Sequence, residues 1–206
     1  MTSISIIGSG KMSSALVEVA ARAGADIQVL RRSTASSSGD RANVTYGALG
    51  DDLTGHLVIL AVPYAAYPSI LDHYRHRLGG KVVIDISNPI DFTTYDELTV
   101  PADSSTAAEL ASQLPRGAAV VKAFNVNLGD TLTTGTNGTT VTTVLFAGDY
   151  AEAKIAVADL IESSGLRAVD VGPLSRAREL EAMGFLQIAL SALGKTRNES
   201  GFTLLS

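Results

Sequence analysis

The pattern that most restricts the fold is a strand, a glycine turn and a helix within the first two dozen residues. Residues 3–8 form a short apolar run, as expected of a buried strand. Apolar side chains then recur at helical spacing, namely Met12, Ala15, Leu16, Val19, Ala20 and Ala23. Gly24 follows, and glycine is suited to ending a helix. A chain that begins with such a βα unit is expected to build a parallel sheet covered by helices.

Short apolar runs alternate with amphipathic stretches along the rest of the chain. Further strands are expected over residues 27–30, 44–46, 56–62, 81–86, 118–124, 141–147 and 167–171. Helices are expected around residues 70–71, over 101–114 and 151–163, and in a last long segment to about residue 193. The predicted fold class is therefore α/β, a Rossmann-type doubly wound, mostly parallel sheet. One domain is expected over residues 1–206, with 174–206 as a C-terminal helix and tail.

Capping and turn residues predict where particular helices begin and where turns and loops lie. Thr106 and Glu109 have the spacing of a capping box, and Ser175 can cap the last helix. Asn137-Gly138, inside the polar stretch 133–140, predicts a turn that links two strands. The Ser- and Thr-rich residues 33–39 predict a loop that a ligand could order, and residues 201–205 predict a final edge segment.

Composition narrows the class of protein. A chain of 206 residues can cover both faces of one sheet but leaves little room for a second large domain. The net charge of −5 argues against nucleic acid as a partner, and the absence of cysteine excludes disulfides and thiolate ligands. No apolar run approaches the roughly 20 residues that span a bilayer, and no signal-type segment opens the chain. We therefore expect a soluble, cytoplasmic protein without a membrane or nucleic-acid partner.

The glycine turn itself predicts a nucleotide site. Gly8-Ser9-Gly10-Lys11-Met12-Ser13 nearly matches G-x-G-x-x-G, in which the first glycine permits a tight turn and the second lets the backbone approach a pyrophosphate. Serine at the third position is a mild departure, because that position requires a small residue. Free N–H groups and the helix dipole favour a phosphate at the start of the helix. A purely structural turn is the alternative, but the motif's place between strand and helix favours dinucleotide binding.

The end of the second predicted strand carries bases where an NAD site has an acid. An NAD-specific site places Asp or Glu about 20 residues beyond the glycines. This chain has Arg31, Arg32 and Ser33 there, whereas Asp26 lies at the opposite end of the strand. Guanidinium groups form charge-assisted hydrogen bonds suited to a 2′-phosphate. The sequence therefore predicts NADPH rather than NADH, with a solvated basic pair as the alternative.

Other patterns are assigned no chemistry. His56, His73 and His76 lack partners at metal-ligand spacing, so no metal site is expected. Tyr150 and Lys154 have the Tyr-x-x-x-Lys spacing of short-chain dehydrogenases, but the glycine turn has a different spacing and a surface helix is expected to begin there. No nucleophile elbow or carboxylate pair indicates hydrolysis. We therefore name no catalytic side chain.

Several further short sequence motifs follow the glycine turn along the chain. They are Arg32, Ala61-Val62-Pro63-Tyr64, Gly80-Lys81-Val82-Val83-Ile84-Asp85, Ser87-Asn88-Pro89, Lys122-Ala123-Phe124-Asn125, Phe146-Ala147-Gly148-Asp149 and residues 172–181. In this order they resemble the NADPH-dependent F420 reductase family, which shares its domain with the cytosolic part of six-transmembrane metalloreductases. The resemblance extends over nearly the whole chain and is more specific than the glycine motif alone.

The resemblance implies a set of cofactor-binding residues. They are Gly8, Ser9, Gly10, Lys11 and Met12 at the turn, Arg31, Arg32 and Ser33 with Ser9 at the 2′-phosphate, Ala61, Val62, Pro63 and Tyr64 along the cofactor, and Asn88, Pro89, Ala123, Phe124 and Asn125 near the nicotinamide. Each group follows a strand, where ligands of open α/β sheets collect. Ordinary turn chemistry is the alternative for Asn88, Pro89 and Asn125. The family usually has serine at Arg31 and glycine at Ser13, and we expect NADPH binding to survive both differences.

The function implied by the resemblance is hydride transfer between NADPH and a small-molecule redox acceptor. F420 is the expected acceptor, with FMN or FAD next, because such rings carry the electrons and the protein only has to orient them. A non-catalytic NADPH sensor, a ferric or flavin reductase and an imine or hydroxyacid reductase remain alternatives. The apolar residues of the last helix also predict a homodimer, and they are Leu180, Met183, Phe185, Leu186, Ile188, Ala189, Leu190 and Leu193.

Overall fold

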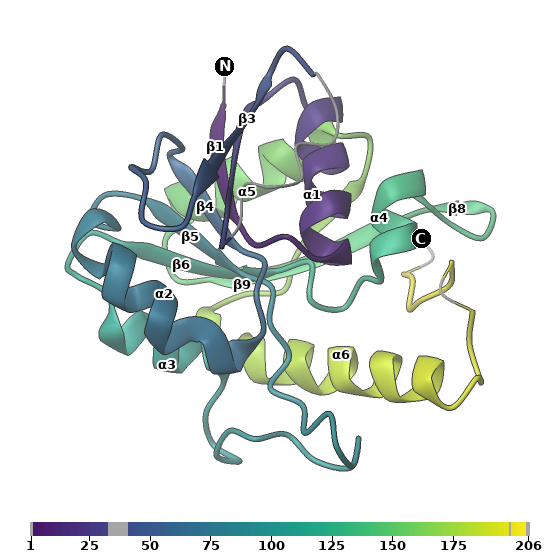
Figure 1. Ribbon diagram of the computed structural model, residues 1–206. Coiled ribbons are helices and arrows are strands. Elements are labelled where there is room, and N and C mark those ends of the chain that lie inside the picture. The colour runs from purple at the N-terminus through teal and green to yellow at the C-terminus, as the bar shows by residue number, and fades with distance from the viewer. Residues whose placement is uncertain (1, 33–40, 198, 205–206) are drawn as a thin grey trace.

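The computed structural model describes residues 2–32, 41–197 and 199–204. Its main sheet has eight strands in the spatial order β10-β9-β6-β5-β4-β1-β2-β3 (Figure 1). Neighbouring strands run parallel, except that β6 and β9 are antiparallel. The strands are β1 (Ser3–Ile7), β2 (Asp26–Arg31), β3 (Val44–Ala48), β4 (Leu57–Leu60), β5 (Val82–Asp85), β6 (Ala119–Ala123), β9 (Thr143–Gly148) and β10 (Arg167–Asp170). The series from β3 through β1 to β6 is the doubly wound Rossmann order, so the predicted fold class is confirmed.

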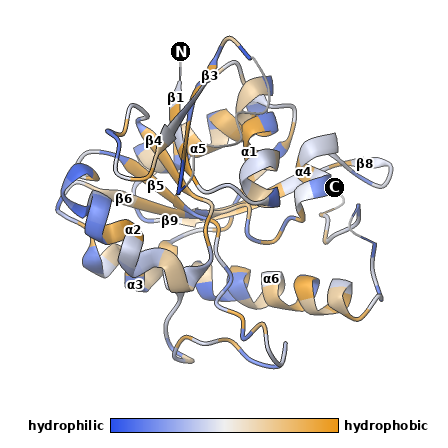
Figure 2. Cartoon of the chain, viewed as in Figure 1, coloured by the Kyte–Doolittle hydropathy of each residue, from blue (hydrophilic) through white to orange (hydrophobic). Residues whose placement is uncertain are grey.

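Helices cover both faces of this sheet. Helices α1 (Lys11–Arg22) and α5 (Ala151–Ser163) pack on one face, and α2 (Tyr67–Tyr74) and α3 (Thr106–Gln113) on the other. The strands between them are among the most hydrophobic parts of the chain (Figure 2). The remaining helices are α4 (Gly129–Thr134), α6 (Ala177–Ala192) and the short 3-10 helices η1 (Tyr64–Ala66), η2 (Arg75–Arg77) and η3 (Leu174–Arg176).

The β1–α1 unit forms as the hydrophobic pattern predicts. Successive β1 side chains point to opposite faces, so Ile6 joins the core under α1 and Ile7 joins the core under α2. Leu16 and Val19 of α1 are buried against the sheet, and burying a side chain of this size contributes about 1.5–3 kcal/mol. The helix is followed by Gly24 at φ +69°, the left-handed conformation expected of a glycine that ends a helix.

The predicted start of α3 is wrong. The helix was expected over residues 101–114 with a capping box of Thr106 and Glu109, but it begins only at Thr106. Ser105 is the N-cap, and its Oγ accepts a hydrogen bond from the N–H of Ala108 at 3.1 Å. Thr106 is fully buried, and its hydroxyl binds charged groups in the interior instead of capping the helix.

Two predictions near the C-terminus are also wrong. Ser175 lies exposed inside η3, and α6 begins after Arg176 without a side-chain cap. Residues 201–204 are not a strand; the side-chain amide of Asn137 holds Gly201 through hydrogen bonds of 2.7 and 3.0 Å. The turn at Asn137-Gly138 is confirmed, because β7 (Thr136–Asn137) and β8 (Thr140–Val141) form a hairpin around it. The predicted loop 33–39 lies outside the described residues.

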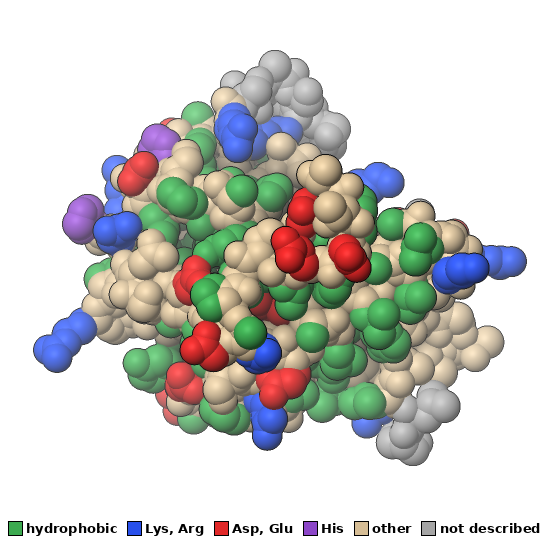
Figure 3. All heavy atoms as spheres, turned by 90° about the horizontal axis from the view of Figure 1, so that it is seen from below, with side chains coloured by type: hydrophobic (Ala, Val, Ile, Leu, Met, Phe, Trp, Pro, Cys, Tyr) green, Lys and Arg blue, Asp and Glu red, His purple; other side chains and the backbone are tan. Residues whose placement is uncertain are grey.

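Helix α6 lies below the carboxyl ends of the central strands (Figure 1) and contacts α3 and β9. It leaves two large apolar side chains in solvent, since Leu186 is 50% and Leu193 70% exposed. The face seen from below shows hydrophobic side chains spread over the side on which α6 ends (Figure 3). Within the described ranges, no helix combines the length and the apolar character that a membrane span requires.

Candidate functional site

The glycine turn between β1 and α1 follows a path that requires glycine at its first position. Gly8 has φ +143°, and a Cβ there would lie 2.2 Å from the carbonyl oxygen of Ala61. The Gly8 N–H donates to the carbonyl of Leu30 at 2.9 Å, which ties the turn to the end of β2. Ser13, at the third motif position, is buried and donates to the Gly8 carbonyl oxygen at 2.9 Å. The serine therefore stabilises the turn.

The second glycine leaves space at the start of α1. Gly10 is the N-cap of this helix, with φ −87° and ψ −176°, and a Cβ there would meet no atom within 4 Å. The first turn of α1 contains no acidic residue. The helix N-terminus thus combines open space with a positive dipole end, which suits an anion.

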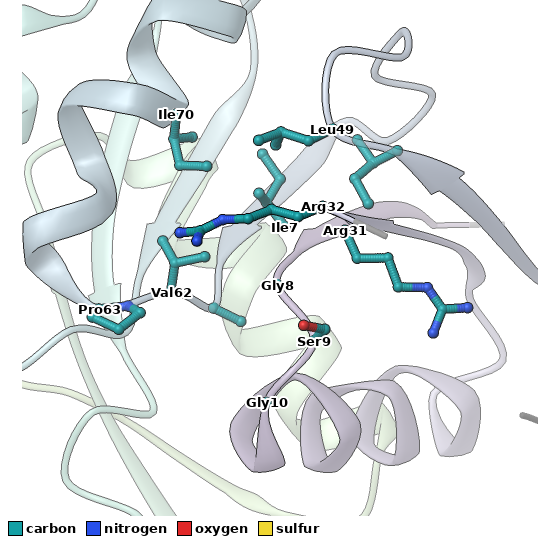
Figure 4. A pocket seen from close by; sticks show the side chains of 12 residues that line it. Ile7, Gly8, Ser9, Gly10, Arg31, Arg32, Leu49, Val62, Pro63 and Ile70 are labelled. Atoms are coloured by element: carbon teal, nitrogen blue, oxygen red, sulfur yellow. The ribbon is translucent and has the colours of Figure 1, made fainter. Parts of the chain in front are cut away.

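A pocket of about 510 Å³ opens between the glycine turn and the ends of β2 and β4 (Figure 4). Its lining includes these predicted site residues: Gly8, Ser9, Gly10, Arg31, Arg32, Ala61, Val62 and Pro63. Ile7, Leu30, Leu49 and Ile70 complete the lining, so the walls are apolar apart from the turn and the two arginines. None of the described residues that line it is acidic, and the pocket therefore favours an anionic ligand that also has an apolar part.

The two arginines at the end of β2 point in different directions (Figure 4). The Arg32 side chain is exposed and extends across the pocket toward the side of Val62, whereas Arg31 extends toward α1. The Arg31 guanidinium carbon lies 4.2 Å from the ring centroid of Tyr46 on β3, a cation–π contact. Ser33 lies outside the described residues.

Lys11 and Met12 lie at the start of α1 but do not line this pocket. Exposed Lys11 borders a separate groove of about 520 Å³ on the far side of the glycine turn, which Gly129 and Asp130 of α4 also line. Met12 is half-buried and packs against the core of the sheet. The turn therefore has an open groove on each side.

The residues expected near the nicotinamide form a polar joint after β5 and β6. The amide of Asn88 donates to the Asn125 carbonyl oxygen at 2.8 Å, and the Asn125 amide donates to Asn88 Oδ1 at 2.8 Å. Pro89, Ala123 and Phe124 are buried, and Phe124 adopts a left-handed φ of +61°. The phenyl ring is thus part of the core, and the residues of this joint do not belong to the lining of the pocket.

Tyr64 also lies outside the pocket lining, in η1, and its hydroxyl donates to the carboxylate of Glu109 on α3. Burial, the hydrogen bond to Glu109 and the nearby carboxylates together raise the pKa of Tyr64 to about 12. Burial and the neighbouring Asp85 raise the pKa of Tyr67, on α2, well above its ordinary range. Neither phenol is therefore a ready proton donor at neutral pH.

A charged cluster missed by the sequence analysis is buried beneath the Asn88–Asn125 joint. The Lys122 ammonium lies 3.0 Å from Asp85 and 2.8 Å from Glu181, and these side chains are at most 1% exposed. Lys122 also donates to Thr106 Oγ1 at 3.0 Å. The Tyr67 hydroxyl donates to Asp85. Burial alone would raise the pKa of Asp85, but the attraction of Lys122 and the hydrogen bonds together lower it.

One signal in the sequence could have indicated this cluster. Lys122 lies within one otherwise apolar strand pattern and Asp85 near the end of another, and a charged side chain in such a strand requires a buried partner. In the parallel pairing of β5 and β6 the two residues are directly opposite each other. Glu181 comes from α6, and only the fold brings it to the same point.

The described residues of the site form no arrangement for acid–base or metal chemistry. Tyr150 is 60% exposed, Lys154 pairs with Asp170 at 2.8 Å, and neither lines the pocket. In the described part of the chain, no three His, Asp or Glu side chains come together as a metal-binding group. The geometry is that of a binding cleft at the carboxyl edge of a sheet, with a helix N-terminus suited to an anion and two arginines, and the polar joint of Asn88 and Asn125 lies outside its lining.

Comparison with known proteins relates this cleft to redox enzymes. Residues 3–89 match the family described as NADP oxidoreductase, coenzyme F420-dependent. The chain is 31% identical over 147 residues to the F420-dependent NADP reductase of Methanocaldococcus jannaschii, covering 69% of this chain and 65% of that protein. It is 30% identical over 183 residues to the metalloreductase STEAP3 of Rattus norvegicus, covering 87% of this chain but only 36% of that protein. The chain thus spans less than two thirds of either relative.

A solved structure from Arthrobacter sp. FB24 has the same fold over the full length. Its TM-score is 0.84 at 24% identity, it covers 98% of this chain and 99% of its own, and its assignment as an F420-dependent NADP reductase is provisional. The resemblance drawn from the sequence blocks is confirmed. The chain is thus similar to the family of coenzyme F420-dependent NADP oxidoreductases.

Proposed function

We propose that the chain binds NADP(H) in the pocket beside the glycine turn. The observation that carries this proposal is the combination of a pocket without acidic side chains among its described lining residues, two arginines at the end of β2 and an unobstructed helix N-terminus. Gly8, Ser9 and Gly10 would hold the pyrophosphate, and Arg31 and Arg32 would hold the 2′-phosphate. The apolar wall of Leu49, Val62 and Ile70 suits an adenine ring.

We further propose that the chain is an oxidoreductase whose acceptor is F420, with FMN or FAD as the next candidates. When bound, NADPH would supply a hydride. The residues of this chain bind and orient the two partners, since none of the described side chains near the cleft is poised to donate or take a proton. The printed functions of the relatives support this assignment, and an acceptor that is itself an electron sink needs no protein acid.

Cofactor choice is tested by titration calorimetry with NADPH and NADH. Charge-assisted hydrogen bonds contribute about 1.5–3 kcal/mol each, so Arg32→Ala should weaken NADPH binding about 10- to 100-fold and leave NADH nearly unchanged. Arg116→Ala is the matched control, because this exposed arginine lies between α3 and β6, outside the pocket lining. Equal affinity of the unmutated protein for both nucleotides would refute the assignment.

Acceptor choice is tested by mixing the protein and NADPH separately with oxidised F420, FMN, FAD and a ferric chelate, following each absorbance. Reduction of F420 alone would support the F420 reductase assignment. Faster reduction of a flavin or of iron would replace it by a flavin or ferric reductase. If NADPH binds and no acceptor is reduced, the chain is a non-catalytic NADPH-binding module.

We also propose that the chain forms a homodimer through α6. The helix carries apolar side chains that its own sheet does not cover, and Leu186 and Leu193 are the most exposed of them. Burying such residues between two copies removes apolar surface from water and is favourable. Light scattering at micromolar concentration should give twice the monomer mass, and Leu186→Glu should shift it toward the monomer. A monomer mass for the unmutated chain would reject the proposal.

A further inference from the structure

The buried cluster is connected directly to the Asn88–Asn125 joint, which the family resemblance places beside the nicotinamide end of bound NADP(H). Besides its two carboxylate partners, Lys122 donates to the carbonyl oxygen of Ser87 at 2.6 Å. Ser87 precedes Asn88 in the chain, and Lys122 itself lies three residues before Asn125. The lysine therefore anchors both backbone segments that carry the Asn88–Asn125 pair.

Helix α6 contacts the same pair from the opposite side. The Asn125 amide donates to the Leu180 carbonyl oxygen at 2.8 Å. A Cβ on Gly184 would lie 2.3 Å from Asn88 Oδ1, so only glycine lets the helix approach this closely. Glu181 lies between these two contact points, and its carboxylate both pairs with the lysine and accepts the backbone N–H of Thr106 at 3.1 Å.

The joint itself is not arranged for maximal stability. Phe124 has a left-handed backbone, which costs about 1–3 kcal/mol for such a residue. Asn125 Oδ1 is buried and accepts no hydrogen bond from the described residues, and an unmet buried acceptor costs about 1–3 kcal/mol. Such features persist only where the surrounding structure enforces them, and here the surrounding structure is the ion cluster and α6.

We propose that Lys122 and Glu181 are positioning residues whose ion pair holds the Asn88–Asn125 joint, and through it seats the nicotinamide end of NADP(H). The inference rests on the proposed NADP(H) site and goes beyond it, because neither residue reaches the pocket. Their effect passes through the Ser87 carbonyl on one side and through the Leu180–Gly184 segment of α6 on the other.

If the Lys122–Glu181 ion pair only stabilised the fold, its loss would affect different measurements than if it positioned the Asn88–Asn125 joint. Loss of a stabilising ion pair lowers the melting temperature but leaves the ligand affinities of the folded protein unchanged. Loss of positioning changes the environment of the nicotinamide and spares the distant adenine end. The fragment 2′,5′-ADP contains the adenine and both phosphate positions of that end but no nicotinamide, so it separates the two roles.

The test compares Glu181→Gln with Glu179→Gln, because Glu179 lies on the same helix but pairs with Arg176 at the surface. Both are titrated with 2′,5′-ADP and NADPH at a temperature where melts show them folded, and the emission of bound NADPH reports the nicotinamide environment. We expect Glu181→Gln to keep its 2′,5′-ADP affinity, to bind NADPH about tenfold more weakly, and to lose the emission change shown by the unmutated protein. Glu179→Gln should match the unmutated protein in all three.

Gly184→Ala reaches the joint without touching the ion cluster and keeps the inference testable if Glu181→Gln does not fold. Alanine favours a helix interior by about 1 kcal/mol over glycine, so any loss reports the collision with Asn88. We expect Gly184→Ala, like Glu181→Gln, to weaken NADPH binding and to leave the affinity for 2′,5′-ADP unchanged. The inference would be overturned if the affinities for 2′,5′-ADP and NADPH fell equally. It would also be overturned if a folded variant showed unchanged NADPH binding and emission. If the unmutated protein binds neither ligand, the proposed function itself fails, and the inference with it.

Discussion

The two glycines of the turn allow a sharp test, because the same substitution should damage the fold at one and the ligand site at the other. At Gly8, alanine would need the positive φ of +143° and would place its Cβ 2.2 Å from the Ala61 carbonyl oxygen. Backbone strain of this kind costs about 1–3 kcal/mol, and overpacking about 1–3 kcal/mol more. A loss of about 3 kcal/mol corresponds to a melting temperature about 6–12 °C lower in a chain of this size.

At Gly10 the same change should leave the free protein nearly intact. Its φ of −87° and ψ of −176° suit any residue, and the new Cβ would have no neighbour within 4 Å. The poorer cap and the reduced entropy of the unfolded chain oppose each other, each by about 0.5–1 kcal/mol. The Cβ would instead occupy the space in which backbone N–H groups donate hydrogen bonds to the pyrophosphate. Losing one such hydrogen bond should weaken NADPH binding about 10- to 100-fold.

Thermal melts without ligand and calorimetric titration of NADPH measure the two effects separately. Gly8→Ala should show the lower melting temperature, and Gly10→Ala should melt like the unmutated protein while binding NADPH poorly. The reasoning is wrong if Gly10→Ala binds NADPH as tightly as the unmutated protein. It is equally wrong if Gly8→Ala melts at the unmutated temperature, since the turn would then tolerate a side chain at its closest contact.

Two further predictions concern stability away from the cleft. Arg22 donates to the carbonyls of Leu132 at 2.7 Å and Thr133 at 2.9 Å, at the end of α4, so Arg22→Met should lower the unfolding free energy by about 2–3 kcal/mol. Urea denaturation should show this loss with NADPH affinity unchanged, and no loss would contradict it. Asn137→Ala removes both bonds to Gly201, so hydrogen exchange of the Gly201 amide should accelerate while the melting temperature changes by less than about 4 °C. Unchanged exchange would show that the tail is held by other contacts.

The sheet was predictable because buried parallel strands are continuous apolar runs that stand out from the helices between them. Helix starts were less so. Ser105 caps the helix one residue before Thr106, because the Thr106 hydroxyl is hydrogen-bonded to Glu181 in the interior. At α6 a 3-10 turn supplies the first backbone bonds, so the helix begins without the predicted Ser175 cap.

The site was predictable where chemistry is local and not where it depends on the pairing of distant residues. The glycine turn and the two arginines each lie within a short stretch of sequence and could be predicted from it, and the structure brings them into one pocket. Lys122 and Asp85 meet only through the register of β5 and β6, and Glu181 joins them only because α6 passes the ends of these strands. The contact of Gly184 with Asn88 likewise depends on the approach of a helix, which no spacing along the chain encodes.

The pH dependence of folding should reveal how strongly the cluster depends on the charge of Asp85. The groups that face its carboxylate are the Lys122 ammonium, the Tyr67 hydroxyl, Ser87 and Thr106, with Glu181 beyond the lysine. Together they lower the folded-state pKa of Asp85 below its unfolded value of about 3.9. A lowered pKa contributes stability that is fully present above the unfolded value and is lost as the pH falls through the folded one.

Asp85→Asn isolates this contribution, because it removes the charge at nearly constant volume. Breaking one side of a buried ion pair costs about 3–5 kcal/mol, so urea denaturation should show a gap of that size between variant and unmutated protein from pH 8 to pH 5. The gap should narrow only below about pH 4, when the unmutated Asp85 takes up a proton and loses its pairing with Lys122. Asp170→Asn is the control at a partly exposed pair with Lys154, for which the gap should stay below about 1 kcal/mol at every pH. A gap for Asp85→Asn that closes already near pH 6 would mean that Asp85 is protonated in the folded protein at that pH. In that case burial, which disfavours the charged form, would outweigh the attraction of Lys122, and the cluster would not be the ion pair on which its positioning role depends.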